Sequence, residues 1–176
     1  RLILKDSGTG VYAFFTGFLY LAVKILLLNK FGSMALPYVC LAMGFSISGR
    51  SAAAMIPSFF PVSDGSVLGR MTKSKRPGRA IAGSFTGLSF PVIGFFILDA
   101  IQPKSLISAD PEFILFILFS SLFIPLLSIA VVVMGLGRMY TKRIGGYSGD
   151  CLGAGVELAE LLHIVLFMLC FGYFYA

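Results

Sequence analysis

The chain has 176 residues, of which 57% are apolar and 12% are charged, and its formal net charge is +6. Soluble domains carry about 25% charged residues, so these values and a mean hydropathy of +0.93 exclude an ordinary water-soluble fold. The net charge is the only feature that favours nucleic-acid binding, and we expect no nucleic-acid partner.

The apolar excess extends over the whole chain, which predicts a single integral-membrane domain over residues 1–176. The chain opens on the charged run RLILKDSGTG, which is unlike a signal peptide, and it has no initiating Met. We therefore expect it to be the later part of a longer protein. Its three cysteines have no metal-ligand spacing and are expected to be buried, unreactive thiols.

Five stretches are apolar and long enough to cross a bilayer, whose apolar core requires about 20 helical residues. They are continuously apolar instead of alternating in polarity, so they predict helices and not the strands of a membrane barrel. We predict an all-α, polytopic membrane helical bundle with about five transmembrane helices. In chain order, these spans are residues 11–28, 35–60, 80–98, 113–136 and 150–175.

Basic residues concentrate in the N-terminal segment, in the loop after the second span and in the loop before the fifth. Because cytoplasmic loops carry the excess of Lys and Arg, these three segments are predicted to face the cytoplasm. We expect a multi-pass protein of the cytoplasmic (inner) membrane, in contact with membrane lipids. The basic residues are Arg1 and Lys5, then Arg70, Lys73, Lys75, Arg76 and Arg79, then Arg138, Lys142 and Arg143.

The second predicted span contains a polar break, S-G-R-S-A-A, at residues 48–53. Arg50 could extend its stem along apolar surface and place its charge at the membrane interface. The serines and the glycine around it favour instead a polar pocket in which Arg50 binds an anion. Lys24 lies late in the first span, and its charge is better explained by a side chain that extends toward the lipid headgroups than by a functional role.

A polar, glycine-rich segment, R-I-G-G-Y-S-G-D-C-L-G-A-G-V-E-L-A-E-L-L, leads into the fifth span at residues 143–162. Gly145, Gly146 and Gly149 permit backbone conformations that other residues avoid, and they leave room for a ligand. Asp150 stands where the N-cap of the following helix is expected. This segment is therefore the first candidate for a functional site.

Three carboxylates follow one side of the helix that this segment begins. Asp150 and Glu157 are seven residues apart and share a face, and Glu160 lies one turn further on. Asp150 could simply cap the helix, and Glu160 could pair with His163. A carboxylate at the centre of a membrane span costs about 3 kcal/mol and usually faces a polar cavity or partner. This cost favours a functional role for Asp150 and Glu157.

Two distant motifs resemble those of the cobalamin 5'-phosphate synthase (adenosylcobinamide-GDP ribazoletransferase) family. G-G-Y-S-G-D-C-L-G-A is similar to the GG-x-[ST]-GD-x-LGA element near the C-terminus of these enzymes, with Ser148 where Thr is usual. R-L-I-L-K-D-S-G-T-G, at residues 1–10, resembles the family's R-L-x-I-M-K-D-S-x-x-G run, with Gly8 where a basic residue is common. S-G-R-S-A-A resembles the polar break of a family span, so the resemblance covers essentially the whole chain.

The resemblance implies transfer of the adenosylcobinamide phosphate moiety of adenosylcobinamide-GDP to α-ribazole or α-ribazole 5'-phosphate, with release of GMP and a requirement for Mg²⁺. Such chemistry needs carboxylates that hold a metal ion or accept a proton, and positively charged side chains that bind the phosphate groups. We expect Asp6 and Asp150 to face a shared cytoplasmic cavity. The candidate residues are Asp6, Asp150 and Glu157 as catalytic groups, Arg1, Lys5, Ser7, Arg50, Arg143, Gly146, Ser148 and Gly149 as substrate contacts, and Asp6 and Asp150 as metal ligands.

One departure from the family pattern predicts an incomplete site. Family members carry an earlier element, DG-x-x-D-x-x-D-G, which the resemblance implies as the source of most metal ligands, and this chain lacks it.

Two other functions remain open. A secondary transporter would show internal repeats, and a CDP-alcohol phosphotransferase-like enzyme would carry D-x-x-D-G-x-x-A-R; neither feature occurs in the chain.

Overall fold

The computed structural model describes residues 11–73, 76–101, 115–117 and 119–175. The chain forms two compact units, Arg1–Ser33 and Met34–Ala176. The run at residues 1–10, with the candidate residues Arg1, Lys5, Asp6 and Ser7, lies outside the described residues. Predictions that depend on it, including the cavity shared by Asp6 and Asp150, stay predictions.

In the described part of the first unit, residues 11–33, an apolar helix, α1 (Val11–Lys30), is followed by the 3₁₀ turn η2 (Phe31–Ser33). The helix forms where the first span is predicted. Within it, the Lys24 ammonium lies 5.5 Å from the ring centroid of Tyr20, one turn earlier. This contact gives the charge of Lys24 a favourable cation–π partner on its own helix.

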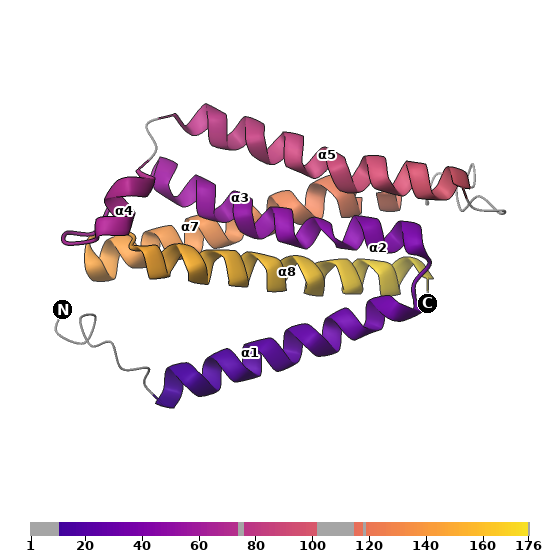
Figure 1. The fold of residues 1–176 in the computed structure, drawn as a ribbon, viewed down its shortest axis with the longest axis horizontal. Coiled ribbons are helices and arrows are strands. Elements are labelled where there is room, and N and C mark those ends of the chain that lie inside the picture. Colours follow the sequence, from indigo (N-terminus) through magenta and orange to yellow (C-terminus); the bar gives the residue numbers. More distant parts are fainter. Residues whose placement is uncertain (1–10, 74–75, 102–114, 118, 176) are drawn as a thin grey trace. The chain divides into compact units, whose positions relative to one another are not determined.

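The second unit is an all-helical bundle, in which the long helices run side by side (Figure 1). The described ranges contain no β-strand, and their one β-bridge is an isolated pairing between Val62 and Tyr147. The helices are α2 (Leu36–Ala42), α3 (Gly44–Phe59), α4 (Val67–Thr72), α5 (Pro77–Ile101), α7 (Ile124–Ile144) and α8 (Gly149–Tyr175), with a π-helical turn η3 (Phe119–Phe123) before α7. The predicted all-α class is confirmed.

Four helical stretches of the second unit are long and apolar enough to cross a membrane. They coincide with the second to fifth predicted spans, which confirms a polytopic bundle; the total of five stays a prediction. The stretches are Leu36–Phe59, Pro77–Ile101, Leu115–Ile144 and Gly149–Tyr173.

Helix α3 is central to the bundle because it packs against α5, α7 and α8. Small residues permit this close packing, as is usual between membrane helices. A Cβ added at Gly87 of α5 would lie 2.9 Å from Ile47, and one added at Gly155 of α8 would lie 2.9 Å from Ile56. The core around this contact consists of Ala52, Ile56, Ile129, Val132, Val133, Tyr147, Cys151, Leu152 and Ala159.

The π-helical turn η3 has a local cause in Pro125, two residues after the turn ends. Pro125 has no backbone N–H, so the usual bond to the carbonyl four residues earlier cannot form, and helices commonly deform at such points. The hydroxyl of Ser121 donates to Ile117 O at 2.6 Å, and that of Ser128 donates to Ile124 O at 2.8 Å. Polar side chains inside this span are thus satisfied by its own backbone.

Candidate active site

The glycine-rich segment forms the tight junction between α7 and α8. Helix α7 ends at Ile144, and Gly145 follows in the left-handed conformation with φ of 79°. Its N–H donates to Thr141 O at 3.2 Å, which closes the last helical turn. Gly146 has a φ of 154°, a conformation that side chains disfavour. Consecutive glycines therefore allow the chain to turn from one span directly into the next.

The connection between α3 and α4 is held on this junction by paired backbone bonds. Tyr147 N donates to Pro61 O at 2.9 Å, and Ser63 N donates to Tyr147 O at 2.9 Å. The hydroxyl of Ser63 adds a bond to Ile144 O at 3.0 Å. The two basic loops predicted to share one membrane side thus lie in direct contact.

The side chain of Tyr147 secures α4 to the same junction. Its ring is fully buried, and its hydroxyl donates to Gly69 O at 3.0 Å. Leu68 packs on Gly149 so closely that an added Cβ there would collide with it. Tyr147 and its neighbours therefore act as the anchor of the connection between α3 and α5.

At Gly146 and Gly149 protein atoms fill the space that we expected a ligand to use, whereas the space beside Gly145 is open. A Cβ at Gly146 would collide with Pro61 O and would lie 2.6 Å from the carbonyl carbon of Val62. The space beside Gly149 is filled by Leu68. The residue pattern alone could not show this, because a glycine needed for packing and one needed for a ligand look the same in sequence.

Asp150 lies in the first turn of α8, because the helix already begins at Gly149. Its side chain is exposed, and it forms no hydrogen bond or ion pair with any other residue that the structure describes. The N-cap position expected for Asp150 is therefore wrong by two residues, because the residue before the helix is Ser148. The exposed carboxylate at the start of α8 is accessible to a substrate proton or to a cation.

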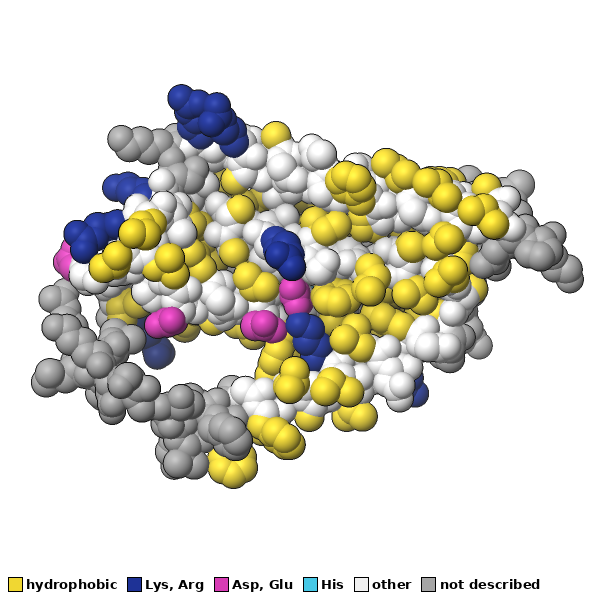
Figure 2. Space-filling view, in the orientation of Figure 1, with side chains coloured by type: hydrophobic (Ala, Val, Ile, Leu, Met, Phe, Trp, Pro, Cys, Tyr) yellow, Lys and Arg dark blue, Asp and Glu magenta, His cyan; other side chains and the backbone are white. Residues whose placement is uncertain are grey.

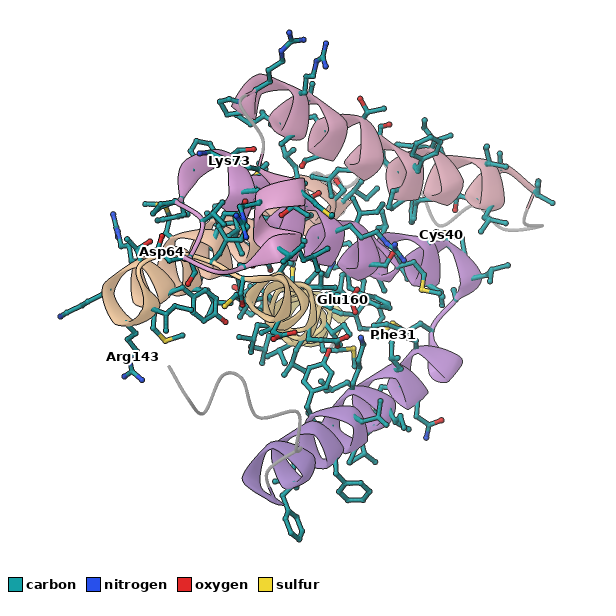
Figure 3. The ribbon with its side chains drawn as sticks, turned by 60° about the vertical axis from the view of Figure 1, so that its left-hand side comes forward. Phe31, Cys40, Asp64, Lys73, Arg143 and Glu160 are labelled. Carbon is teal, nitrogen blue, oxygen red and sulfur yellow. The ribbon has the colours of Figure 1, made fainter. Side chains whose placement is uncertain are left out.

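The two glutamates of α8 have different surroundings. Glu157 is exposed, as is Asp150 on the same face, whereas Glu160 is only 8% exposed. A Cβ at Gly49 of α3 would lie 2.6 Å from Glu160 Cγ and 2.9 Å from its Oε1. Gly49 thus makes room for this carboxylate between the helices. Figure 3 shows Glu160 away from the end of the bundle that holds Asp64, Lys73 and Arg143.

A buried hydrogen bond between α3 and α8 lies one turn beyond Glu160. His163 is fully buried, and its Nδ1 lies 2.7 Å from the hydroxyl oxygen of Ser48. Nε2 of His163 has no hydrogen-bond partner among the described residues. Of the two roles open to His163, pairing with Glu160 or packing in the core, the structure therefore favours packing. Ser48 and Gly49 of the polar break S-G-R-S-A-A therefore serve the contact between α3 and α8.

We expect Ser48→Ala to destabilise the protein by about 1–3 kcal/mol, because Nδ1 of the buried histidine would lose its partner. Thermal unfolding in detergent measures the effect. Ser46→Ala is the matched control, since among the described residues the Ser46 hydroxyl bonds to Met43 O, just before α3 begins. It should change stability by less than about 0.5 kcal/mol. Equal stability of the two variants would contradict a structural role for the Ser48–His163 bond.

Of the other predicted site residues, Arg143 and Ser148 lie at the junction between α7 and α8, and Arg50 lies within α3. Arg143 is exposed in the last turn of α7, and Ser148 donates a hydrogen bond to Cys151 Sγ at 3.2 Å. Arg50 is exposed on α3, next to the glycine that accommodates Glu160. The described residues include no group of three or more His, Cys, Asp or Glu side chains that could hold a metal.

These features define a polytopic membrane protein whose polar loops meet at one end and present an exposed carboxylate at the start of a span. The chain belongs to the cobalamin-5-phosphate synthase family, whose model matches residues 1–168. No solved structure matches it significantly.

Curated relatives carry the name adenosylcobinamide-GDP ribazoletransferase. That of Vibrio parahaemolyticus is 29% identical over 91% of this chain and 52% of its own length. That of Shewanella piezotolerans is 31% identical over 95% of this chain and 57% of its own length. The Vibrio cholerae protein is 27% identical over 96% of this chain and 56% of its own length. The chain thus spans about half the length of the curated relatives it matches.

Proposed function

We propose that this chain forms part of an adenosylcobinamide-GDP ribazoletransferase, which transfers the adenosylcobinamide phosphate moiety to α-ribazole or its 5'-phosphate and releases GMP. One observation carries the proposal. The family element G-G-Y-S-G-D is fixed at the end of the bundle by Tyr147 and Gly146, and it leaves the carboxylate of Asp150 exposed at the start of α8.

The reaction needs a hydroxyl of the ribazole to attack the phosphorus that bears the adenosylcobinamide group. An O–P bond forms, the bond to the bridging oxygen of the diphosphate breaks, and GMP leaves with that oxygen. Asp150 can take the proton of the attacking hydroxyl. Arg143, exposed near the same end, can attract the anionic diphosphate. Arg50 and Glu157 are further candidate contacts, on α3 and α8.

Asp150 also has the chemistry of a magnesium ligand. Mg²⁺ is usually held by one or two carboxylates together with substrate phosphates and water, so the exposed carboxylate of Asp150 fits this role. Asp6, the other candidate ligand, lies outside the described residues. A bound Mg²⁺ would neutralise charge on the phosphate oxygens.

We expect the end of the bundle that carries Asp150 to face the cytoplasm, because the basic loops meet there. Single cysteines placed at Lys73 and at Lys142, both exposed, should be shielded from an impermeant thiol reagent in intact cells and labelled after permeabilisation. A cysteine at Ser108, in the basic-poor loop, should react in intact cells. The reverse pattern would overturn the orientation.

The proposed activity is tested with the full-length protein in proteoliposomes, by measuring GMP after addition of adenosylcobinamide-GDP with and without α-ribazole. We expect release only when both are present, and we expect it to depend on Mg²⁺. Release without α-ribazole would indicate a hydrolase, and the absence of release under all conditions would contradict the proposal.

A further inference from the structure

Helix α4 exposes a group of apolar side chains at the end of the bundle. Val67 is 61% exposed, Leu68 is 55% exposed and Met71 is 77% exposed. Val67 and Met71 are four residues apart and share a face, whereas Gly69, two residues from each, is buried and bonds to Tyr147 through its carbonyl. The apolar face of α4 therefore points away from the bundle.

Basic side chains surround this apolar face. Arg70 and Lys73 are exposed at the end of α4, and Arg76 and Arg79 are exposed where α5 begins. Figure 2 shows dark blue side chains next to hydrophobic ones at the end of the molecule where α4 lies. The same short segment thus offers both apolar contact area and positive charge.

The position of α4 relative to the candidate spans indicates what this surface meets. Helix α3 ends at Phe59 and α5 begins at Pro77, and both belong to stretches able to cross a membrane. Helix α4 therefore lies where the chain leaves and re-enters the bilayer. An apolar helix face flanked by Lys and Arg is typical of segments that lie in the headgroup layer, and polybasic segments next to spans attract anionic lipids.

We propose that α4 is an interfacial anchor that binds anionic phospholipid headgroups. Val67 and Met71 enter the boundary between headgroups and acyl chains, while Arg70 and Lys73 bind lipid phosphates. Tyr147 holds α4 on the junction before α8, so the same lipid contact steadies the element that carries Asp150. This inference depends on the membrane fold and is independent of the proposed reaction.

The test places a fluorophore on Met71→Cys in the full-length protein, reconstituted in nanodiscs. Phosphatidylcholine brominated on its acyl chains quenches a probe that reaches the acyl boundary. We expect quenching at position 71, and we expect phosphatidylglycerol in the bilayer to increase it. A probe at Asp64→Cys is the matched control, because Asp64 is exposed in the same connection and should stay in water. Labelled wild-type protein corrects for the native cysteines.

A charge-removal arm tests the headgroup contact. The double variant Arg70→Gln/Lys73→Gln should raise the phosphatidylglycerol fraction needed for half-maximal quenching by about fivefold or more, because each basic residue near an anionic surface contributes about a factor of five. Arg138→Gln/Lys142→Gln removes the same charge from α7 at the same end of the bundle and should have a much smaller effect. Added salt should reproduce the loss.

Two results would overturn the proposal. A probe at position 71 that is never quenched would show that water or another protein segment covers this face of α4. Quenching that is the same with and without phosphatidylglycerol, and unchanged in Arg70→Gln/Lys73→Gln, would show that no anionic headgroup is bound there.

Discussion

Full-length protein carrying Asp150→Asn should insert into the membrane and accumulate normally, yet release GMP on the order of a hundredfold more slowly than the wild type. The carboxylate of Asp150 is exposed and bonds to no other described residue, so its loss removes charge without removing a contact. Asn is also acceptable near a helix N-terminus. The initial rate of GMP release, normalised to protein in the membrane, measures the effect.

Asp64→Asn provides the matched control for this prediction. Asp64 is an exposed carboxylate in the connection between α3 and α4, which is held on the same junction. It is not one of the candidate site residues. We expect its substitution to leave the rate within about twofold of the wild type. Near-normal turnover by Asp150→Asn would remove this residue from the chemistry and leave it a structural role only.

Gly146→Ala should be among the most destabilising single substitutions in the chain, with a loss of about 3 kcal/mol or more. The added Cβ would collide with the backbone of Pro61 and Val62, which cannot move without breaking the bonds to Tyr147. The φ of 154° adds strain for any side chain. The melting temperature in detergent and the amount of protein in the membrane both measure the loss.

Gly135→Ala is the matched control, because a Cβ at Gly135 of α7 would meet no atom within 4 Å. Alanine favours a helix over glycine by about 1 kcal/mol, so this variant should be as stable as the wild type or more stable. A Gly146→Ala protein with wild-type melting would show that the contact between the glycine junction and residues 61–63 is not tight.

The helices could be predicted from the sequence because their signal is local. A continuously apolar stretch of about 20 residues specifies a membrane helix almost regardless of its neighbours, and the second to fifth predicted spans coincide with helices. The ends of the helices are harder to predict from sequence than the helices themselves. The turn signals at Gly145 and Gly149 did not show that α8 starts before Asp150, because helix ends depend on a balance of weak capping effects.

The contacts between helices could not be predicted in this way. Ser48 and His163 are 115 residues apart, and either residue alone is compatible with a lipid-facing, packing or ligand role. Residues 61–63 carry no motif, yet they hold the glycine junction in place. Pairing of this kind follows from how helices pack in three dimensions. The closest available signal was the alternation of basic loops, which predicted a common membrane side for the two connections.

The most direct test of the proposed transfer is to follow the phosphorus atom next to the cobinamide into the product. Full-length protein would be given α-ribazole and adenosylcobinamide-GDP that carries a radioactive phosphorus next to the cobinamide. We predict that the label appears in a product that also contains the ribazole, that GMP is unlabelled, and that Asp150→Asn suppresses the product while Asp64→Asn does not. Label in inorganic phosphate or in GMP, or a labelled corrinoid without ribazole, would contradict transfer by this protein.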